Sequence, residues 1–365
     1  MATTINANNT DGVVITPDTS GELELQANGV TKAKVTANGL QDANGNSLRG
    51  GMYRNLIING DMQIAQRGTS KTGINNDSYN TIDRWYYNSI GSTASAWTQS
   101  QSTDVPTGQG FGYSLKMQCT TSAPSDTEGA SLEHRIESQM LQHLKFGTSF
   151  AESFTISFWV KSNKTGTFIC EINQKDIDTV ISRTYTINSA DTWEKKTVTF
   201  VGDTSNAMDN DNTEGFRVAW WLYAGSTYNS GTLNTTWSDR ATNASNRAVG
   251  QTNLVDSTSN YINITGVQLE IGEGSSNFEF LPYDVQLQRC ERYYEISGGR
   301  WRGYDNGYTF VGTNFFKVTK RATPTVTQTG GSGSIGDITT VKCSSVIGGG
   351  NFDTSTFNLL INAEL

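Results

Sequence analysis

Residues 263–294 constrain the fold of this 365-residue chain more than any other segment. The segment opens with a largely apolar run that predicts a strand. A glycine turn, a pair of phenylalanines and Pro282 follow, and glycine and proline are the residues that most often interrupt regular structure. Residues 283–294 then carry apolar side chains near helical spacing. We therefore expect a strand that closes one domain and a short helix that leads into the next.

Four further stretches between residues 153 and 223 predict strands in the same part of the chain. Apolar and polar side chains alternate over residues 153–162, 193–201 and 216–223, as on strands with one buried face. Residues 168–172 follow residues 153–162 after a short turn, which predicts a hairpin between them. Strands of this kind, joined by turns and long loops, favour an all-β sandwich of two sheets over residues 53–285.

Composition supports the all-β class and argues against nucleic acid as a partner. Charged residues make up 17% of the chain, against about 25% for an average soluble domain. The net charge is −8, from 27 basic and 35 acidic residues, with no basic run, so nucleic acid is an unexpected partner. No stretch approaches the roughly 18 apolar residues that span a bilayer.

The first 52 residues differ from the rest. Short strands separated by Asn-Gly pairs predict a small meander, since Asn-Gly is a strong turn signal. The few large apolar residues cannot form a monomeric core, and a thin meander is marginal alone. Three copies around one axis could bury them jointly, which predicts a homotrimeric stalk or anchor. A disordered tail is the alternative.

Residues 286–365 predict a small β domain, with expected strands at 308–311, 315–318, 322–328 and 356–361. At this size it would be small for a free-standing domain. We expect it to pack on the sandwich or on neighbouring copies.

Four motifs in a fixed order resemble a jelly-roll segment found in bacteriophage tail-fibre and related virion proteins. They are NLIINGDMQIAQRG at 55–68, TIDRWYY at 81–87, SFTISFWVKS at 153–162, and the segment 263–294. The resemblance covers roughly residues 53–294, and FNLLINAEL at the end of the chain resembles the last strand of phage fibre tips. It implies a jelly roll like that of carbohydrate-binding modules, on the surface of a virion assembled in the host cytoplasm. A start without signal-peptide features agrees with that expectation.

Enzyme signatures are absent from the sequence. His134 and His143 lie nine residues apart without a metal-binding motif, and there is no nucleophile elbow or phosphate-binding loop. His134 is interpreted as a surface or hydrogen-bonded sheet residue. The pairs Asp176/Asp178 and Asp209/Asp211 could in principle serve glycan hydrolysis, but loop acids of this kind are typically solvated. We expect a protein that binds and does not catalyse.

Aromatic residues are the candidates for glycan contact, because sugars present apolar C–H faces beside dense hydroxyl groups. Trp159 and Trp221 are out of phase with the apolar residues of their strands, Tyr223 shares the phase of Trp221, and Trp237 lies in a polar loop. Packing under loops or against another subunit is the alternative for Trp159 and Trp221.

A structural calcium ion is the expected cofactor, if there is any. Jelly rolls of the carbohydrate-binding type often hold one near their first strand, and Asn59-Gly60-Asp61 resembles that motif. Calcium prefers six to eight oxygen ligands, and Asp61 and Glu270 are the candidates. The four cysteines are far apart and are interpreted as buried apolar residues.

These observations predict a non-enzymatic virion protein of the tail-fibre type. Its expected partners are its own copies, other virion proteins through the first 52 residues, and a glycan on the host surface. A capsid-anchored head fibre or decoration protein, a secreted polysaccharide-binding or depolymerising protein, and a purely structural joint remain as alternatives.

Overall fold

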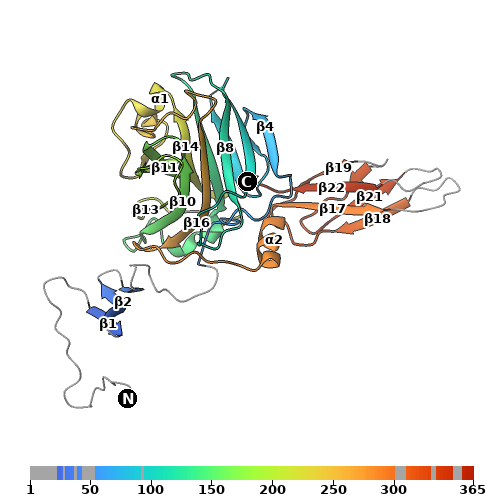
Figure 1. The fold of residues 1–365 in the computed structure, drawn as a ribbon. Helices are drawn as coiled ribbons and strands as arrows, with labels where there is room; N and C mark the ends of the chain where they lie inside the picture. Colours follow the sequence, from blue (N-terminus) through green and yellow to red (C-terminus); the bar gives the residue numbers. More distant parts are fainter. Residues whose placement is uncertain are drawn as a thin grey trace, which may run out of the picture.

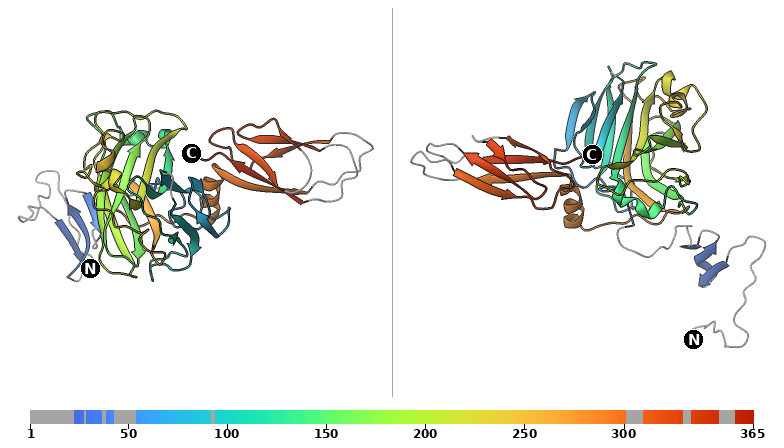
Figure 2. Two further views of the ribbon diagram at one scale, coloured as in Figure 1. Left: turned by 90° about the horizontal axis from the view of Figure 1, so that it is seen from above. Right: turned by 180° about the vertical axis from the view of Figure 1, so that it is seen from behind.

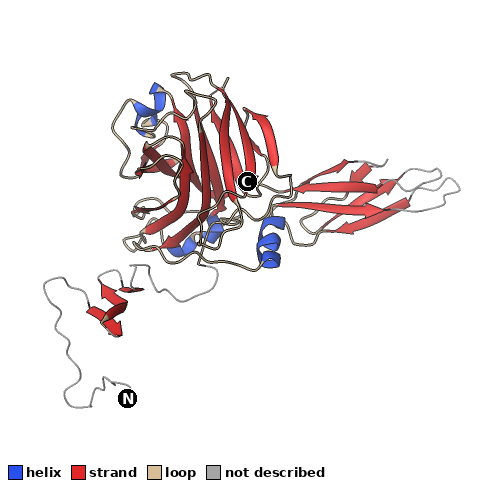
Figure 3. Cartoon of the chain, in the orientation of Figure 1, coloured by secondary structure: helices blue, strands red, loops and turns tan. Residues whose placement is uncertain are grey.

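The computed structural model describes residues 23–27, 29–36, 39–42, 54–91, 94–300, 310–329, 334–347 and 356–365. Strands dominate these residues, and the few helices are short (Figure 3). Two large sheets form a sandwich, and strands β17–β22 extend from one side of it (Figure 1). None of the helices described is long and apolar enough to cross a bilayer.

The sandwich consists of two antiparallel sheets, as the all-β prediction requires. The six-stranded sheet has the order β13 (Glu194–Phe200), β10 (Phe154–Ser162), β16 (Tyr261–Ile271), β8 (Ser114–Thr121), β7 (Ala96–Ser102), β4 (Ser70–Ile74). The seven-stranded sheet has the order β15 (Ser238–Asp239), β12 (Thr179–Ile187), β11 (Gly166–Gln174), β14 (Glu214–Ala224), β9 (Gly129–Glu137), β6 (Trp85–Ile90), β5 (Ser78–Tyr79).

The core lies between the two sheets and is rich in aromatic side chains. Phe158 on β10 meets Trp220 on β14 edge to face, with ring centroids 5.7 Å apart. Phe154 and Phe216 make a second contact across the sandwich at 5.4 Å. All four are buried because apolar residues alternate along each strand and one face of each sheet turns inward. The alternation predicted for residues 153–162 is confirmed.

The predicted hairpin between residues 153–162 and 168–172 is wrong. Strand β10 pairs with β13 and β16, whereas β11 pairs with β12 and β14 in the other sheet. The short connection therefore crosses from one sheet to the other. Both strands carry apolar faces that must reach the same core from opposite sides, which a hairpin within one sheet would not allow.

The short helices and turns lie at the edges of the sandwich. Two 3₁₀ turns follow β9, η1 (Ser138–Met140) and η2 (Gln142–Leu144). A loop that carries α1 (Ser226–Asn229) and η3 (Ala244–Asn246) follows β14. The helix predicted within residues 283–294 is confirmed as α2 (Tyr283–Glu291), and it spans the predicted domain boundary at residue 285.

The C-terminal strands form two small sheets. One has the order β17 (Tyr294–Arg300), β22 (Thr356–Asn362), β19 (Thr325–Thr329), and the other β18 (Phe310–Phe315), β21 (Lys342–Ile347), β20 (Ser334–Gly336). Residues 316–318 are not in a strand, and residues 308–309 of another predicted strand lie outside the described residues. This unit projects away from the sandwich in both views of Figure 2. Its apolar core is small, with four buried members: Phe316, Cys343, Leu359 and Ile361.

The last residues of the chain return to the sandwich and form a buried junction with it. Glu364 pairs with Arg84, which is fully buried, and with Arg67 at 3.1 Å. The Arg84 guanidinium also stacks on the ring of Tyr293, 3.5 Å from its centroid. Arg135 donates a 2.9 Å hydrogen bond to the main-chain oxygen of Leu365. We call these residues, Arg67, Arg84, Arg135, Tyr293 and Glu364, the junction cluster.

The N-terminal meander is present over residues 23–42. Strands β1 (Leu23–Ala27), β2 (Val30–Thr36) and β3 (Gly39–Asp42) form one antiparallel sheet. Four of its large apolar residues are 41–54% exposed: Leu25, Val30, Val35 and Leu40. Residues 1–22 and 43–52 of the predicted anchor, with Asn28 and Asn38 of its turns, lie outside the described residues.

Candidate functional site

Trp159 lies on the outer face of the six-stranded sheet, where it is half-buried. Its strand turns the ring outward because the neighbouring residues, Phe158 and Val160, point into the core. The strand register places Lys195 of β13 on one side of Trp159 and Thr265 of β16 on the other. Lys195 is exposed, whereas Thr265 is buried and its hydroxyl donates to the Tyr113 carbonyl at 2.7 Å, so the lysine is the polar neighbour that a ligand at Trp159 could reach.

A row of polar side chains crosses the same face two residues further along β10. Lys161 lies opposite Asn263, and Asn263 lies opposite Lys116 of β8. Neighbouring strands are ~4.8 Å apart, so the two lysines start about 10 Å from each other. Residues two apart on one strand are separated by about 7 Å, so Trp159 borders this row.

Two more aromatic side chains border the row. Trp193, just before β13, donates a 3.0 Å hydrogen bond from its indole nitrogen to Asp104. Tyr261, the first residue of β16, holds the Nζ atom of Lys116 4.6 Å from its ring centroid and hydrogen bonds to Asp191. We call the surface formed by Lys116, Trp159, Lys161, Trp193, Lys195 and Tyr261 the aromatic–lysine face.

Asp104 places a carboxylate on this face. It forms a 2.6 Å ion pair with Lys161 and accepts the hydrogen bond from Trp193. Partial burial acts to raise the pKa of Asp104, but the Lys161 and Trp193 hydrogen bonds outweigh it and hold that pKa below its ordinary value. Lys116 lowers the pKa further through its charge. The site therefore favours an ionised carboxylate.

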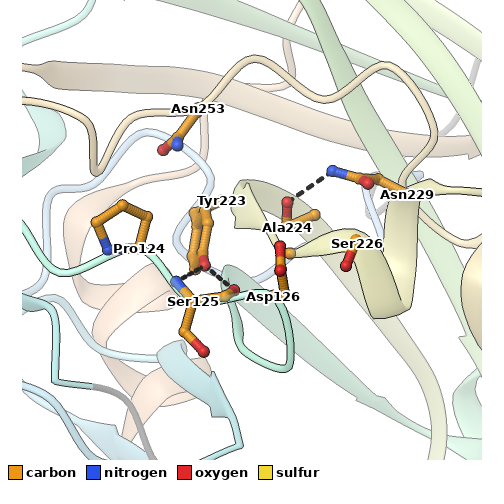
Figure 4. Close-up of a pocket in the computed structure, with 9 residues that line it drawn as sticks. Pro124, Ser125, Asp126, Tyr223, Ala224, Ser226, Asn229 and Asn253 are labelled. Atoms are coloured by element: carbon orange, nitrogen blue, oxygen red, sulfur yellow. Dashed lines mark hydrogen bonds between the residues drawn. The ribbon is translucent and has the colours of Figure 1, made fainter.

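Tyr223 lies at the floor of an open pocket at the end of the sandwich, with a volume of about 600 Å³ (Figure 4). Its hydroxyl exchanges hydrogen bonds with the main chain of Ser125, and its ring is only 3% exposed. Asp126, Ser226 and Asn253 complete a mostly polar lining. Because the tyrosine ring is covered, this pocket offers hydroxyl, amide and carboxylate groups and little aromatic surface.

Trp221 points to the outer face of the seven-stranded sheet, as its phase predicts, but it is fully buried there. It packs with Ile169 and Ala248 beneath the loop that follows β14, and the Arg247 guanidinium lies 4.9 Å from its ring. The predicted common phase of Trp221 and Tyr223 is wrong, because the pairing of β14 with β9 shifts register between them. Tyr223 joins the main core instead.

Trp237 is half-buried beside the core of the sandwich. Its ring lies 5.5 Å from that of Phe146 and 6.4 Å from that of Phe216, and its nitrogen donates to the Val201 carbonyl at 2.9 Å. The four predicted aromatic residues are thus distributed over different surfaces. Of these, only Trp159 belongs to the aromatic–lysine face.

The two predicted calcium ligands lie in separate hydrogen-bond networks. Glu270 accepts hydrogen bonds from the amide and hydroxyl of Ser276 at 2.6 and 2.8 Å and from Gln268 at 3.0 Å. Asp61 accepts from Gln63 at 2.7 Å, and burial raises its pKa. Among the described residues there is no group of three or more His, Cys, Asp or Glu that could hold a metal ion.

The Asn59-Gly60 pair has a structural role. The buried Asn59 side chain bonds to the amide and carbonyl of Ile64, both at 2.9 Å. Gly60 accepts from the amide of Val267 at 2.9 Å and lies so close that an added Cβ would be 2.1 Å from the Val267 carbonyl oxygen. The motif thus joins the start of the sandwich to β16.

His134, Asp176 and Asp178, which were considered for catalysis, have other partners. His134 is fully buried, so its interpretation as a surface residue is wrong. Burial and the charge of Arg84 lower the pKa of His134. Its Nε2 atom faces the main chain of Ile58. Asp178 is held by Lys175 and Arg240, and Asp176 accepts from Ser138 and the amide of Asp209. These acids fasten loops to the sandwich. The four cysteines are free and buried, as predicted.

No protein-family model and no curated protein matches the chain. Among solved structures, the enzymatically active domain of tailspike protein 4 from bacteriophage CBA120 is 15% identical with a TM-score of 0.33. It aligns with 60% of this chain, and the chain spans only 22% of that structure's length. A family 11 carbohydrate-binding module from Clostridium thermocellum, in complex with a β-1,3-1,4-mixed-linked tetrasaccharide, is 10% identical with a TM-score of 0.28. The alignment covers 57% of this chain and 98% of the module. The CBM22-1-CBM22-2 tandem domain of Paenibacillus barcinonensis Xyn10C is 13% identical with a TM-score of 0.29. The alignment covers 64% of this chain and 53% of the tandem domain.

All three TM-scores lie below 0.5, so these likenesses carry no functional argument for this chain. Of the six residues of the aromatic–lysine face, Trp159 alone was predicted as a site residue. The other five, Lys116, Lys161, Trp193, Lys195 and Tyr261, were not. Lys116 lies between Leu115 and Met117, and this alternation would have placed it on an outer face. Which strands lie side by side could not be read from alternation alone.

Proposed function

We propose that this chain is a structural protein of a phage virion, of the tail-fibre type, that binds a host-surface glycan through the aromatic–lysine face. The observation that carries the proposal is the half-buried Trp159 on the outer face of the six-stranded sheet, beside the exposed Lys195. An aromatic ring can stack on the C–H face of a sugar while neighbouring hydroxyl and ammonium groups bond its oxygens. Binding without catalysis is the role that these side chains support.

The N-terminal sheet supports a homotrimer in which residues 1–52 form the stalk and contact other virion proteins. Its four exposed apolar side chains have no core of their own in the described residues. Three copies would remove this apolar surface from water. Three linked sugar-binding faces would also raise the avidity of weak single sites. Light scattering on the purified full-length chain should give three times the mass of one chain, and a monomer at micromolar concentration would contradict the trimer.

Replacement of Trp159 with Ala is expected to weaken glycan retention about tenfold. This corresponds to the loss of ~1.4 kcal/mol, near the upper range for one aromatic contact. Retention of the chain on polysaccharides extracted from the host surface, and blocking of phage adsorption, would measure the change. The unfolding midpoint should stay close to that of the unaltered chain, because the indole lies outside the core.

The matched control is Asp126→Asn, which changes the pocket of Figure 4 instead. Retention that survives Trp159→Ala and is lost in Asp126→Asn would move the binding site to that pocket. A chain that binds glycan but never blocks adsorption would favour the structural joint. Labelling of the chain on intact particles would separate a tail fibre from a head fibre.

A further inference from the structure

The aromatic–lysine face differs in charge from the chain as a whole. The chain carries a net charge of −8, yet three lysines gather on this one face. Lys161 and Lys116 flank Asn263 on adjacent strands, and Lys195 is exposed beside Trp159. Asp104 and Asp191 place carboxylates in contact with the face. A ligand with negative charge would complement the lysines better than a neutral one.

Asp104 shows how such a ligand could be held. Its carboxylate is 45% exposed and contacts Lys161 at 2.6 Å and the Trp193 indole nitrogen at 3.0 Å. An ammonium and an indole N–H thus already converge on one carboxylate at the surface. The Lys116 ammonium lies on the Tyr261 ring, close enough to affect the pKa of Asp104.

We infer that the face recognises an acidic polysaccharide whose sugars carry carboxylates, that is, a uronate polymer. A uronate carboxylate takes the place that Asp104 occupies, bound by Lys161 and Trp193 with Lys116 nearby. The adjacent sugar ring stacks on Trp159, about 7 Å away along the strand. Asp104 then competes with the ligand and lowers its affinity. This inference rests on the proposed glycan-binding function and specifies its ligand class.

The test compares acidic polysaccharides with their neutral methyl esters, since esterification removes the charge and leaves the sugar backbone unchanged. Polygalacturonate, alginate and hyaluronan, each with its ester, would be titrated against the full-length chain. The acidic form of at least one pair is expected to bind about tenfold more tightly than its ester at low salt. The preference should shrink as salt rises, because salt screens exposed charges.

Two variants act in opposite directions. Lys161→Gln should weaken binding of the acidic form about three- to fivefold, as expected for loss of one exposed ion pair. Asp104→Asn should strengthen it by a similar factor, because the competing carboxylate is gone. A merely structural role for Asp104 would not produce tighter binding.

Glu152→Gln is the matched control for Asp104→Asn. Glu152 also pairs with a lysine, Lys145, at 2.6 Å on an exposed surface, but outside the aromatic–lysine face. It should leave binding unchanged. Equal binding of the acidic and ester forms would overturn the uronate inference while leaving glycan binding in place. Binding of neither form of any pair would overturn both. Weaker binding in Asp104→Asn would overturn the competition.

Discussion

Replacement of Glu364 with Gln is expected to lower the free energy of unfolding by about 3–5 kcal/mol, as for other broken buried ion pairs. Glu364 is 5% exposed and pairs with Arg84, which is fully buried, and with Arg67. Burial acts to lower the pKa of Arg84, but Glu364, together with Tyr79, Tyr293 and Cys290, outweighs burial and raises that pKa. The guanidinium therefore stays charged in the folded chain. A neutral amide at position 364 would leave that charge buried without a carboxylate partner. Urea unfolding followed by tryptophan fluorescence would measure the loss.

The control for this prediction is Glu152→Gln, which removes an exposed carboxylate from its pair with Lys145. Exposed pairs are worth about 0–1 kcal/mol, so this variant should unfold almost as the unaltered chain does. Losses of equal size in the two variants would show that the junction cluster contributes no more than a surface ion pair.

Replacement of Gly60 with Ala should destabilise the sandwich by about 3 kcal/mol or more, at the upper end for overpacked sites. The added Cβ would lie 2.1 Å from the Val267 carbonyl oxygen and 3.1 Å from the Val267 carbonyl carbon. That carbonyl cannot move freely, because it accepts a 3.1 Å hydrogen bond from the Asn55 side chain. Relief of the clash would break the contact between the first segment of the sandwich and β16. The shift of the thermal unfolding midpoint is the measurement.

Gly112→Ala provides the matched control, since a Cβ there would meet no heavy atom within 4 Å. A change within about 0.5 kcal/mol is expected for it, as for other surface substitutions. If Gly60→Ala unfolded at the same midpoint as Gly112→Ala, the close approach of Gly60 to β16 would not hold in solution.

The sequence predicted where the strands lie better than it predicted which strands pair with each other. Alternation located β10, β13 and β14, because burial of one sheet face imposes a period of two on each strand. The same alternation fits either sheet, so it could not show that the chain crosses the sandwich between β10 and β11. The register shift between Trp221 and Tyr223 was equally hidden, since a bulge leaves no composition signal in so apolar a strand.

The candidate site could be predicted only in part for the same reason. Trp159 was identified from its phase, and it does lie on an outer face. Trp221 was identified by the same rule, but the loop after β14 covers it. The alternation along a strand predicts on which face of the sheet a side chain lies. It does not predict whether a loop covers that face. Asp61 was chosen from a local motif whose glycine serves packing against β16.

The junction cluster also sets an order for synthesis. Arg84 and Glu364 are separated by 280 positions in the sequence, so the ribosome must make almost the whole chain before the pair can form. Until then Arg84 lacks the carboxylate of Glu364. Contacts between residues this far apart in sequence also form slowly. A chain cut before residue 363 would present that unpaired cation to cellular proteases. Closure of the junction would therefore distinguish chains that contain Glu364 from shorter ones.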